Sequence, residues 1–299
     1  MLSVLLILAF AAVFHGILGR TRSILSGRKG PKILQTVYNL VLLFRKGEVI
    51  SVDSGKIFQL APAVSFVAVL IALLMAPFGK CGTVISFPGD FVLFAYLLAL
   101  GRFAMILGAL DTASSFEGMG AAREALYGML AEPAFFVLAG TFAMLTGHNS
   151  FAEIFGFFDM PSLSAAIPGM LAAFAFFLML LVETGRLPVD DPRTHLELTM
   201  VHEVMILDYS GFDLALIHIT TCIKAAVYST LTVLCVVPGN LHTAIYMPLF
   251  IVLILLVPVI TGFFESFRAR NRLHRNPSYI LTMTVMAIVS FVTAAIVFR

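Results

Sequence analysis

Eight stretches of about 20 mostly apolar residues, each long enough to cross a bilayer as a helix, follow one another along this chain. No other feature constrains its fold as strongly. Short segments that contain Gly and Pro separate neighbouring stretches. The sequence therefore predicts an all-α, polytopic membrane protein with eight transmembrane helices. Their predicted ranges are 1–19, 57–78, 89–110, 127–147, 164–183, 211–236, 244–264 and 279–298. The start at residue 127 is the weakest boundary, because the Gly- and Ala-rich stretch 111–126 could continue a helix.

The composition excludes several classes of protein. Charged residues make up 12% of the 299 residues, against roughly 25% in soluble domains, and apolar residues make up 60%. A net charge of +2 is too small for the strongly basic surface that is typical of nucleic-acid-binding proteins. The three cysteines are scattered, so they predict neither a disulfide framework nor a zinc site. The N-terminus lacks the pattern of a removable signal peptide, and we expect residues 1–299 to form a single integral membrane domain.

Lysine and arginine are distributed very unequally between the two predicted sides of the membrane. Only Lys80 and Arg299 lie on one side, while Arg102 and Lys224 lie within spans. Because these residues accumulate in cytoplasmic loops, we predict that both termini lie on the outer side. The inner side carries fifteen of the 19: Arg20, Arg22, Arg28, Lys29, Lys32, Arg45, Lys46, Lys56, Arg123, Arg186, Arg193, Arg268, Arg270, Arg272 and Arg275.

The first inner segment, residues 20–56, combines a basic turn with an amphipathic stretch. The turn reads GRKGPKILQ and contains Arg28, Lys29, Gly30 and Pro31. In the stretch 33–46, apolar residues recur at helical spacing, which predicts an amphipathic helix on the inner membrane surface. This helix would serve either as a surface anchor or as a ledge on which a soluble partner docks.

The second inner segment, residues 183–211, is unusually polar for this chain. It carries eight charged residues, and Asp191 followed by Pro192 is typical of a helix start. We predict a polar helix from there to about Tyr209, too polar to span the bilayer. The segment lacks the HExxH pattern of metalloproteases, so we predict no metal site. The eight charged residues are Glu183, Arg186, Asp190, Asp191, Arg193, Glu197, Glu203 and Asp208.

Charged residues inside or at the ends of predicted spans form a second group of candidates. A charge within the bilayer costs a few kcal/mol, about 2.5–3.5, and usually marks function. Such groups can exchange protons, although the two cations could also only neutralise nearby carboxylates. Glu132, expected in the middle of the bundle, is followed by Pro133, which can kink its helix. The group consists of Arg102, Asp111, Glu132, Asp213 and Lys224.

The 183–211 segment resembles the signature of a known family. ETGRLPVDDPRTHLELTMVHEVMILDYSG is similar to a motif of the eight-span membrane subunit of energy-converting [NiFe] hydrogenases related to complex I. That group includes the formate hydrogenlyase, hydrogenase-4, Ech-type and membrane-bound hydrogenase complexes, and respiratory complex I, the NADH–quinone oxidoreductase, contains a homologue as its subunit 1. Three further motifs extend the resemblance over nearly the whole chain: GRKGPKILQ, LGALDTASSFEGMGAAREA and FESFRARNRL.

The resemblance implies a role in a redox complex of a prokaryotic inner membrane. In the family, acidic residues line a hydrated path for ion coupling, and inner segments dock soluble subunits. The implied partners are a hydrogenase-like large subunit, an iron–sulfur small subunit and antiporter-like membrane subunits. Iron–sulfur clusters and a [NiFe] centre would reside on those partners, with no cofactor or catalytic residue in this chain.

The expected site residues divide into two groups. The proton path and coupling group is Glu132, Glu183, Asp190, Glu197, Glu203, Asp208, Asp213, Lys224, Arg102 and Asp111. The docking group is Arg28, Lys29, Gly30, Pro31, Arg186, Arg193, Arg270 and Arg272.

Two departures from the complex I pattern leave alternatives open. The basic turn is shorter here, and three more residues separate Glu197 from Asp208. Both changes fall where complex I forms its quinone chamber, so they disfavour a lipid quinone as electron acceptor. A quinone-site subunit, the membrane subunit of a sulfur-reducing complex, a free-standing transporter and a passive anchor remain alternatives.

Overall fold

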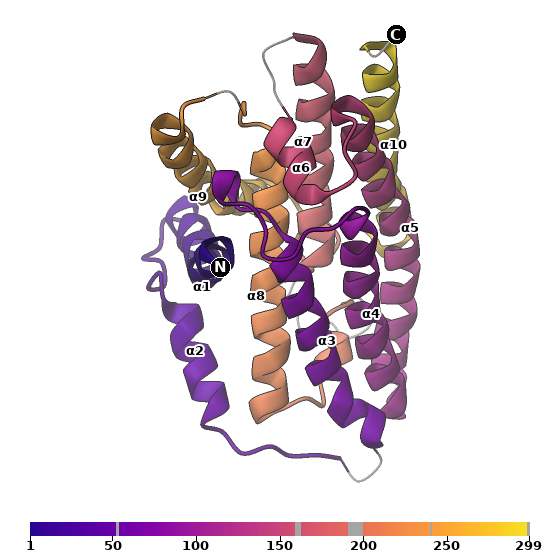
Figure 1. Cartoon of the computed structure of the whole chain (residues 1–299). Coiled ribbons are helices and arrows are strands. Elements are labelled where there is room, and N and C mark those ends of the chain that lie inside the picture. Colours follow the sequence, from indigo (N-terminus) through magenta and orange to yellow (C-terminus); the bar gives the residue numbers. More distant parts are fainter. Residues whose placement is uncertain (52–53, 159–162, 191–199, 240, 298–299) are drawn as a thin grey trace.

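The computed structural model describes residues 1–51, 54–158, 163–190, 200–239 and 241–297, and every regular element within them is a helix (Figure 1). Eight of these helices are long and apolar enough to cross a membrane. The predicted number of spans is therefore confirmed. The eight helices are α1 (Leu2–Leu25), α3 (Lys56–Met75), α4 (Asp90–Asp111), α5 (Ser115–Thr146), α7 (Leu163–Glu183), α8 (Gly211–Leu234), α9 (Thr243–Phe267) and α10 (Asn276–Val297).

Shorter elements connect the long helices. Two are α-helices, α2 (Gln35–Phe44) and α6 (Phe151–Phe157). Three are single turns of 3-10 helix: η1 (Gly79–Cys81), η2 (Val204–Ile206) and η3 (Leu273–Arg275). α2 confirms the helix predicted within residues 33–46. None of its residues is fully buried, and Tyr38, Val41 and Leu42 are exposed.

α5 differs from its prediction, because it begins at Ser115 and not near residue 127. A short non-helical segment separates it from α4, and within that segment Ala113 has a positive φ of 56°. The polar residues of the first turns argued against a span, yet Glu117 and Glu124 are buried against protein. Since their partners come from other segments, local hydropathy could not place this boundary.

The helix predicted from Asp191 to about Tyr209 does not continue through residues 200–209, and residues 191–199 lie outside the described part of the chain. Only η2 is helical between Met200 and Tyr209. The Asp190 carboxylate accepts hydrogen bonds from the backbone N–H groups of Val201 and His202, both at 3.0 Å. Such side-chain acceptors replace the carbonyl partners that an α-helix would supply.

α8 lies at the centre of the bundle. It packs against α1, α2, α3, α7 and α9, and most of its side chains are buried. Its buried hydroxyl groups donate to backbone carbonyls four residues earlier, at 2.8 Å for Thr220 and Thr230 and 2.7 Å for Ser229. These bonds satisfy polar groups inside an apolar core, so α8 can carry polar side chains into the middle of the bundle.

The remaining helices surround α8 unevenly. α3, α4, α5, α7 and α10 form one side, and Figure 1 shows α4, α5 and α10 running together at the right. α1 packs against α8 and α9 on the other side, and Figure 1 shows it nearly end-on, at a steep angle to α8. The interior where α1, α4, α5, α7 and α8 approach each other holds the polar cluster described next.

Candidate functional site

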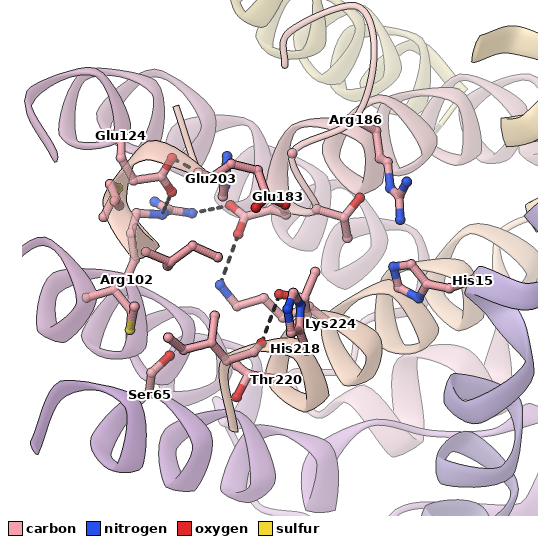
Figure 2. Close-up of a pocket in the computed structure, with 18 residues that line it drawn as sticks. His15, Ser65, Arg102, Glu124, Glu183, Arg186, Glu203, His218, Thr220 and Lys224 are labelled. Carbon is pink, nitrogen blue, oxygen red and sulfur yellow. Dashed lines mark hydrogen bonds and ion pairs between the residues drawn. The ribbon is translucent and has the colours of Figure 1, made fainter. Parts of the chain in front are cut away.

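A cavity of about 280 Å³ lies in the interior of the bundle and is lined mainly by polar and charged side chains (Figure 2). Three basic residues, three acidic residues and three histidines line it. They are Arg102, Arg186, Lys224, Glu124, Glu183, Glu203, His15, His202 and His218. Such a concentration of charge in an apolar chain needs pairing, because an isolated buried ion is costly.

Arg102 is the hub of these ion pairs. It is buried on α4, and its guanidinium contacts carboxylates from α5 and α7. Nη1 lies 2.9 Å from Glu132 Oε1, Nε lies 3.4 Å from Glu124 Oε1, and Nη2 donates a short hydrogen bond to Glu183. The planar fork of a guanidinium presents five donors at once, which allows one cation to join three carboxylates.

Glu183 lies between two cations. Besides Arg102, the Lys224 Nζ of α8 lies 3.7 Å from Glu183 Oε2. Glu183 is the last residue of α7, where the negative end of the helix dipole disfavours a carboxylate. The two cations offset this effect. The result is a continuous line of ion pairs, Lys224–Glu183–Arg102–Glu132, hereafter called the charge line.

The Glu132 end of the charge line reaches the outside of the bundle. The side chain of Glu132 is 44% exposed, although it lies within a membrane-spanning helix. A small hollow of about 30 Å³ lies there, lined by Tyr96 and Phe136 among others. The sequence predicted that Glu132 lies in the middle of the bundle. The structure instead has it at the surface, held by Arg102.

A tight turn after α7 brings Arg186 into the cavity. Gly185 has a φ of +59°, the Gly185 N–H donates to Val182 O, and the Arg186 N–H donates to Leu181 O at 2.8 Å. This is the Schellman pattern of helix ends, which favours glycine. Arg186 lies 3.9 Å from Glu265 of α9, which also pairs with Arg22 of α1 at 2.5 Å. Arg186 was expected in the docking group, but it lies in the interior.

The residues just before η2 carry a second set of titratable groups. His202 lies 3.3 Å from Glu124 Oε2 and 3.9 Å from Asp190 Oδ2. Burial raises the pKa of Glu203, and Asp190 adds to this shift, whereas His202 and Arg186 oppose it. A carboxyl with a raised pKa exchanges its proton closer to neutral pH. Glu203 is therefore suited to proton exchange at the wall of the cavity.

Several predicted path residues lie away from the cavity. Asp111 accepts a hydrogen bond from the backbone N–H of Phe58 at the start of α3, at 3.0 Å. Asp213 faces Glu48, and Asp208 is exposed. Glu197 and Arg193 lie outside the described residues. The structure thus brings together Arg102, Glu132, Glu183, Glu203 and Lys224. Asp190 is buried outside the cavity, next to its lining residue His202.

The remaining docking candidates lie at the surface or near it. Arg28, Lys29 and Arg272 are exposed. A Cβ at Gly30 would lie 2.8 Å from the Arg20 Cα, so the turn that includes Pro31 packs closely on the end of α1. Arg270 is half-buried, and its Nη2 lies 3.3 Å from Asp190 Oδ1. Within this group, Arg28, Lys29 and Arg272 are thus the cations that lie at the surface.

Three residues of the site were not identified as candidates from the sequence. Glu124 and Glu265 occur inside motifs that carried the family resemblance, so the motifs contained a signal that residue-level reasoning did not use. His15 is a single histidine in the first apolar stretch, and a search of the spans for Asp, Glu, Lys and Arg does not find it. Among the described residues, no group of three or more His, Cys, Asp or Glu side chains could hold a metal ion.

Comparisons with known proteins agree with this architecture. Residues 1–298 match the family model described as NADH dehydrogenase. Formate hydrogenlyase subunit 4 of Escherichia coli (strain K12) is 29% identical over 284 residues, which cover 93% of this chain and 92% of that protein. Hydrogenase-4 component C of the same strain is 30% identical over 233 residues, covering 78% and 73%.

Two further comparisons extend the range of relatives. A subunit of the NADH-quinone oxidoreductase of Dinoroseobacter shibae is 29% identical over 192 residues, 59% of this chain and 54% of that protein. A chain of the membrane-bound sulfane sulfur reductase, an archaeal respiratory membrane complex, shares the fold, with a TM-score of 0.79, 22% identity and 98% of both chains covered. The family expected from the motifs is thereby confirmed: this chain belongs to the NADH dehydrogenase family.

Proposed function

We propose that this chain is the membrane subunit of a hydrogenase-type redox complex, in which it anchors the soluble subunits and couples their turnover to ion movement. The relatives named formate hydrogenlyase subunit 4 and hydrogenase-4 component C support the type of complex. The excess of Lys and Arg in alternate loops supports an orientation with both termini outside. In this orientation the exposed Arg28, Lys29 and Arg272 face the cytoplasm, where a hydrogenase-like large subunit and an iron–sulfur small subunit would dock.

The charge line is the observation that carries the coupling role. It joins the polar cavity to the outer surface of the bundle through Lys224, Glu183, Arg102 and Glu132. A passive anchor has no need of this arrangement, because replacing a buried ion-pair network with apolar residues is often neutral or stabilising. The network is therefore better explained by a function that moves charge.

The proposed mechanism is electrostatic. Negative charge gained by a docked redox partner next to the inner segments would favour protonation of Glu203. That protonation removes a negative charge from the cavity and changes the balance that holds Glu183 between Lys224 and Arg102. A shift of one pKa unit corresponds to about 1.4 kcal/mol, so small rearrangements are enough to move an ion along the charge line.

Replacing Glu183 tests this role in the assembled complex. Glu183→Gln keeps the size of the side chain but removes the charge shared by Arg102 and Lys224. We expect electron turnover to continue while ion uptake by sealed membrane vesicles is lost, and Glu132→Gln should have the same effect. Glu153→Gln, an exposed position on α6, is the matched control. Full coupling in both Glu183→Gln and Glu132→Gln would refute the proposal.

The identity of the complex needs a separate experiment. The chain would be purified from its native membrane in mild detergent, with its partners identified and their nickel and iron measured. Iron–sulfur partners with nickel support the hydrogenase assignment. Iron–sulfur partners without nickel would move the assignment to a sulfur-reducing or complex-I-type relative. A chain that is always isolated alone would contradict a subunit role.

The exposed end of the charge line supports a membrane partner as well. A carboxylate within a span is costly when it faces lipid, and Glu132 leaves 44% of its side chain uncovered. We propose that an antiporter-like membrane subunit covers Glu132 and receives the coupled charge there. Cross-linking from a cysteine at Tyr96, which lines the adjacent hollow, should capture that subunit, and cross-linking from a cysteine at Val252 on α9 should not.

A quinone-site role is the second candidate. The observation in its favour is a second cavity, of about 370 Å³, lined by leucines of α2 and α8 and opening beside the central one. Turnover of the purified complex with a short-chain quinone as acceptor distinguishes the two functions. Turnover that depends on added quinone would favour this candidate. Turnover that is the same with and without quinone would favour the hydrogenase-type assignment.

A further inference from the structure

Two histidines that the charge line does not use stand between two cavities. His15 of α1 and His218 of α8 both line the central cavity of about 280 Å³, and Figure 2 shows both imidazoles among its lining side chains. The same two residues line the second cavity of about 370 Å³, together with Thr221, which also belongs to both. The two cavities are therefore neighbours that share a wall of protonatable side chains.

The second cavity lies beneath the amphipathic helix α2, hereafter called the α2 cavity. α2 contributes Thr36, Asn39 and Leu43 to its lining, and α8 contributes Cys222. No residue of α2 is fully buried, so α2 is a thin cover over the cavity. Although leucines make up much of the lining, the side chains of Thr36 and Asn39, together with the two imidazoles, supply the polar partners that a bound water needs.

Within the described part of the chain, the two histidines face charged side chains in the central cavity but none in the α2 cavity. Among the described residues that line the α2 cavity, none is Asp, Glu, Lys or Arg. The titratable or charged groups that face His15 are Arg186, His218 and Cys222, whose Sγ lies 3.5 Å from His15 Nδ1. On the other side, His218 shares the central cavity with Lys224 and Glu183. The imidazoles are thus the only protonatable nitrogens among the described residues that line the α2 cavity.

We propose that His15 and His218 carry protons between the α2 cavity and the charge line, so that protons enter the membrane subunit from beneath α2. This inference rests on the proposed coupling function and assigns its ion as the proton. An imidazole takes up a proton at one ring nitrogen and releases another from the second nitrogen. Sodium, by contrast, needs several oxygen ligands, which the two imidazoles do not offer.

Each transfer step is balanced. A hydrated proton (H3O+) that enters the α2 cavity protonates the free nitrogen of His218 and leaves a neutral water molecule, and the N–H bond on the other nitrogen breaks. Its proton passes to water in the central cavity, next to Lys224 and Glu183. The ring is left neutral in its other tautomer, and a rotation of the ring turns its N–H toward the central cavity again, ready for the next transfer. His15 performs the same exchange from α1, and no oxidant or reductant takes part.

The first test removes the imidazoles in the assembled complex. His218→Gln and the double variant with His15→Gln keep polar side chains but cannot shuttle protons. We expect proton uptake per electron to fall about a hundredfold in the double variant, since a positioned proton-transfer group contributes at least this much. Electron turnover without coupling should remain. Glu183→Gln is measured in parallel, as the test of the charge line itself.

The second test closes the entry without touching a histidine. Leu43 lines the α2 cavity, and Leu43→Trp should fill part of it. Val41 lies on the exposed side of the same helix, so Val41→Trp is the matched control. We expect Leu43→Trp to slow proton uptake and Val41→Trp to leave it unchanged. This variant keeps the inference testable even if the histidine variants fail to assemble.

The possible outcomes separate the inference from the function on which it rests. If Glu183→Gln uncouples the complex while the histidine and Leu43→Trp variants stay coupled, the entry beneath α2 is refuted and the coupling function stands. If all variants stay coupled, both are refuted. If Leu43→Trp stops electron turnover itself, the α2 cavity admits the electron acceptor and the proton entry is refuted.

Discussion

Arg102 of α4 lies directly against the backbone of α5 at Gly128. A Cβ added at Gly128 would fall 2.9 Å from the Arg102 Cδ, closer than real Cβ atoms approach a neighbour. The absence of a side chain at Gly128 therefore lets the guanidinium lie between α5 and α7. From this position it reaches Glu132 and Glu183 at the same time.

Adding a methyl group at Gly128 should displace Arg102. We expect Gly128→Ala to destabilise the protein by about 1–3 kcal/mol, as overpacking does, and to weaken ion coupling. Gly140 lies on the same helix with nothing within 4 Å of its added Cβ. Gly140→Ala should therefore be neutral or stabilising by about 0.4–1 kcal/mol. Thermal unfolding of both variants in detergent is the measurement, and equal melting temperatures would contradict the packing argument.

Removing the Arg102 charge should be more severe. Arg102→Gln leaves Glu124 and Glu183 buried without their shared cation, and breaking a buried pair in this way costs about 3–5 kcal/mol. Arg102→Lys should recover only part of this loss, because a single ammonium group cannot join three carboxylates. Yield and unfolding temperature check this order. The exposed Arg272→Gln is the control, and a loss as large as that of Arg102→Gln would show that burial is not the cause.

Asp190 should hold the segment between α7 and α8 in place. Its carboxylate accepts from the N–H groups of Val201 and His202 and pairs with Arg270. Asp190→Ala should cost about 1–3 kcal/mol, the penalty for leaving buried donors unsatisfied. Hydrogen exchange at residues 200–206 should accelerate. Asp208→Ala removes an exposed carboxylate from the same segment and should leave this exchange unchanged, whereas acceleration in both variants would argue against a specific role for Asp190.

Glu203 should make stability depend on pH. Burial raises its pKa above the ordinary value of the unfolded chain, so the folded state favours the protonated form. This stabilising contribution is complete below the unfolded pKa and is lost as the pH rises through the folded pKa. Glu203→Gln should remove the dependence and become more stable than the wild type at the upper end of that range. Unfolding temperature against pH measures this, with Glu153→Gln as a control that keeps the wild-type slope.

The number and order of the spans could be predicted because each span satisfies its own backbone hydrogen bonds and needs only about 20 apolar residues. The same reasoning failed where polar groups find partners from distant segments. Glu117 accepts the Asp208 N–H at 3.0 Å, and Glu124 contacts Arg102 and His202. The first turns of α5 therefore looked too polar for a buried helix.

The four residues of the charge line could be picked out from the sequence, but their arrangement could not. Arg102, Glu132, Glu183 and Lys224 stood out because charges are rare in apolar stretches. Their pairing depends on how α4, α5, α7 and α8 pack, and no spacing along the chain encodes it. Asp111 fits the same pattern in the sequence, yet it accepts from the Phe58 N–H at the start of α3 and lies outside the cavity.

The sequence by itself determined the fold class, the spans, the family and the set of charged residues from which a site could be built. Hydropathy and motifs are properties of short stretches of the chain, so they can be recognised in the sequence alone. Only the tertiary structure decided which charges meet, that Glu132 reaches the outer surface, and that His15 and His218 separate two cavities. Those facts depend on contacts between helices far apart in the chain, where one missing side chain at Gly128 determines the position of a cation.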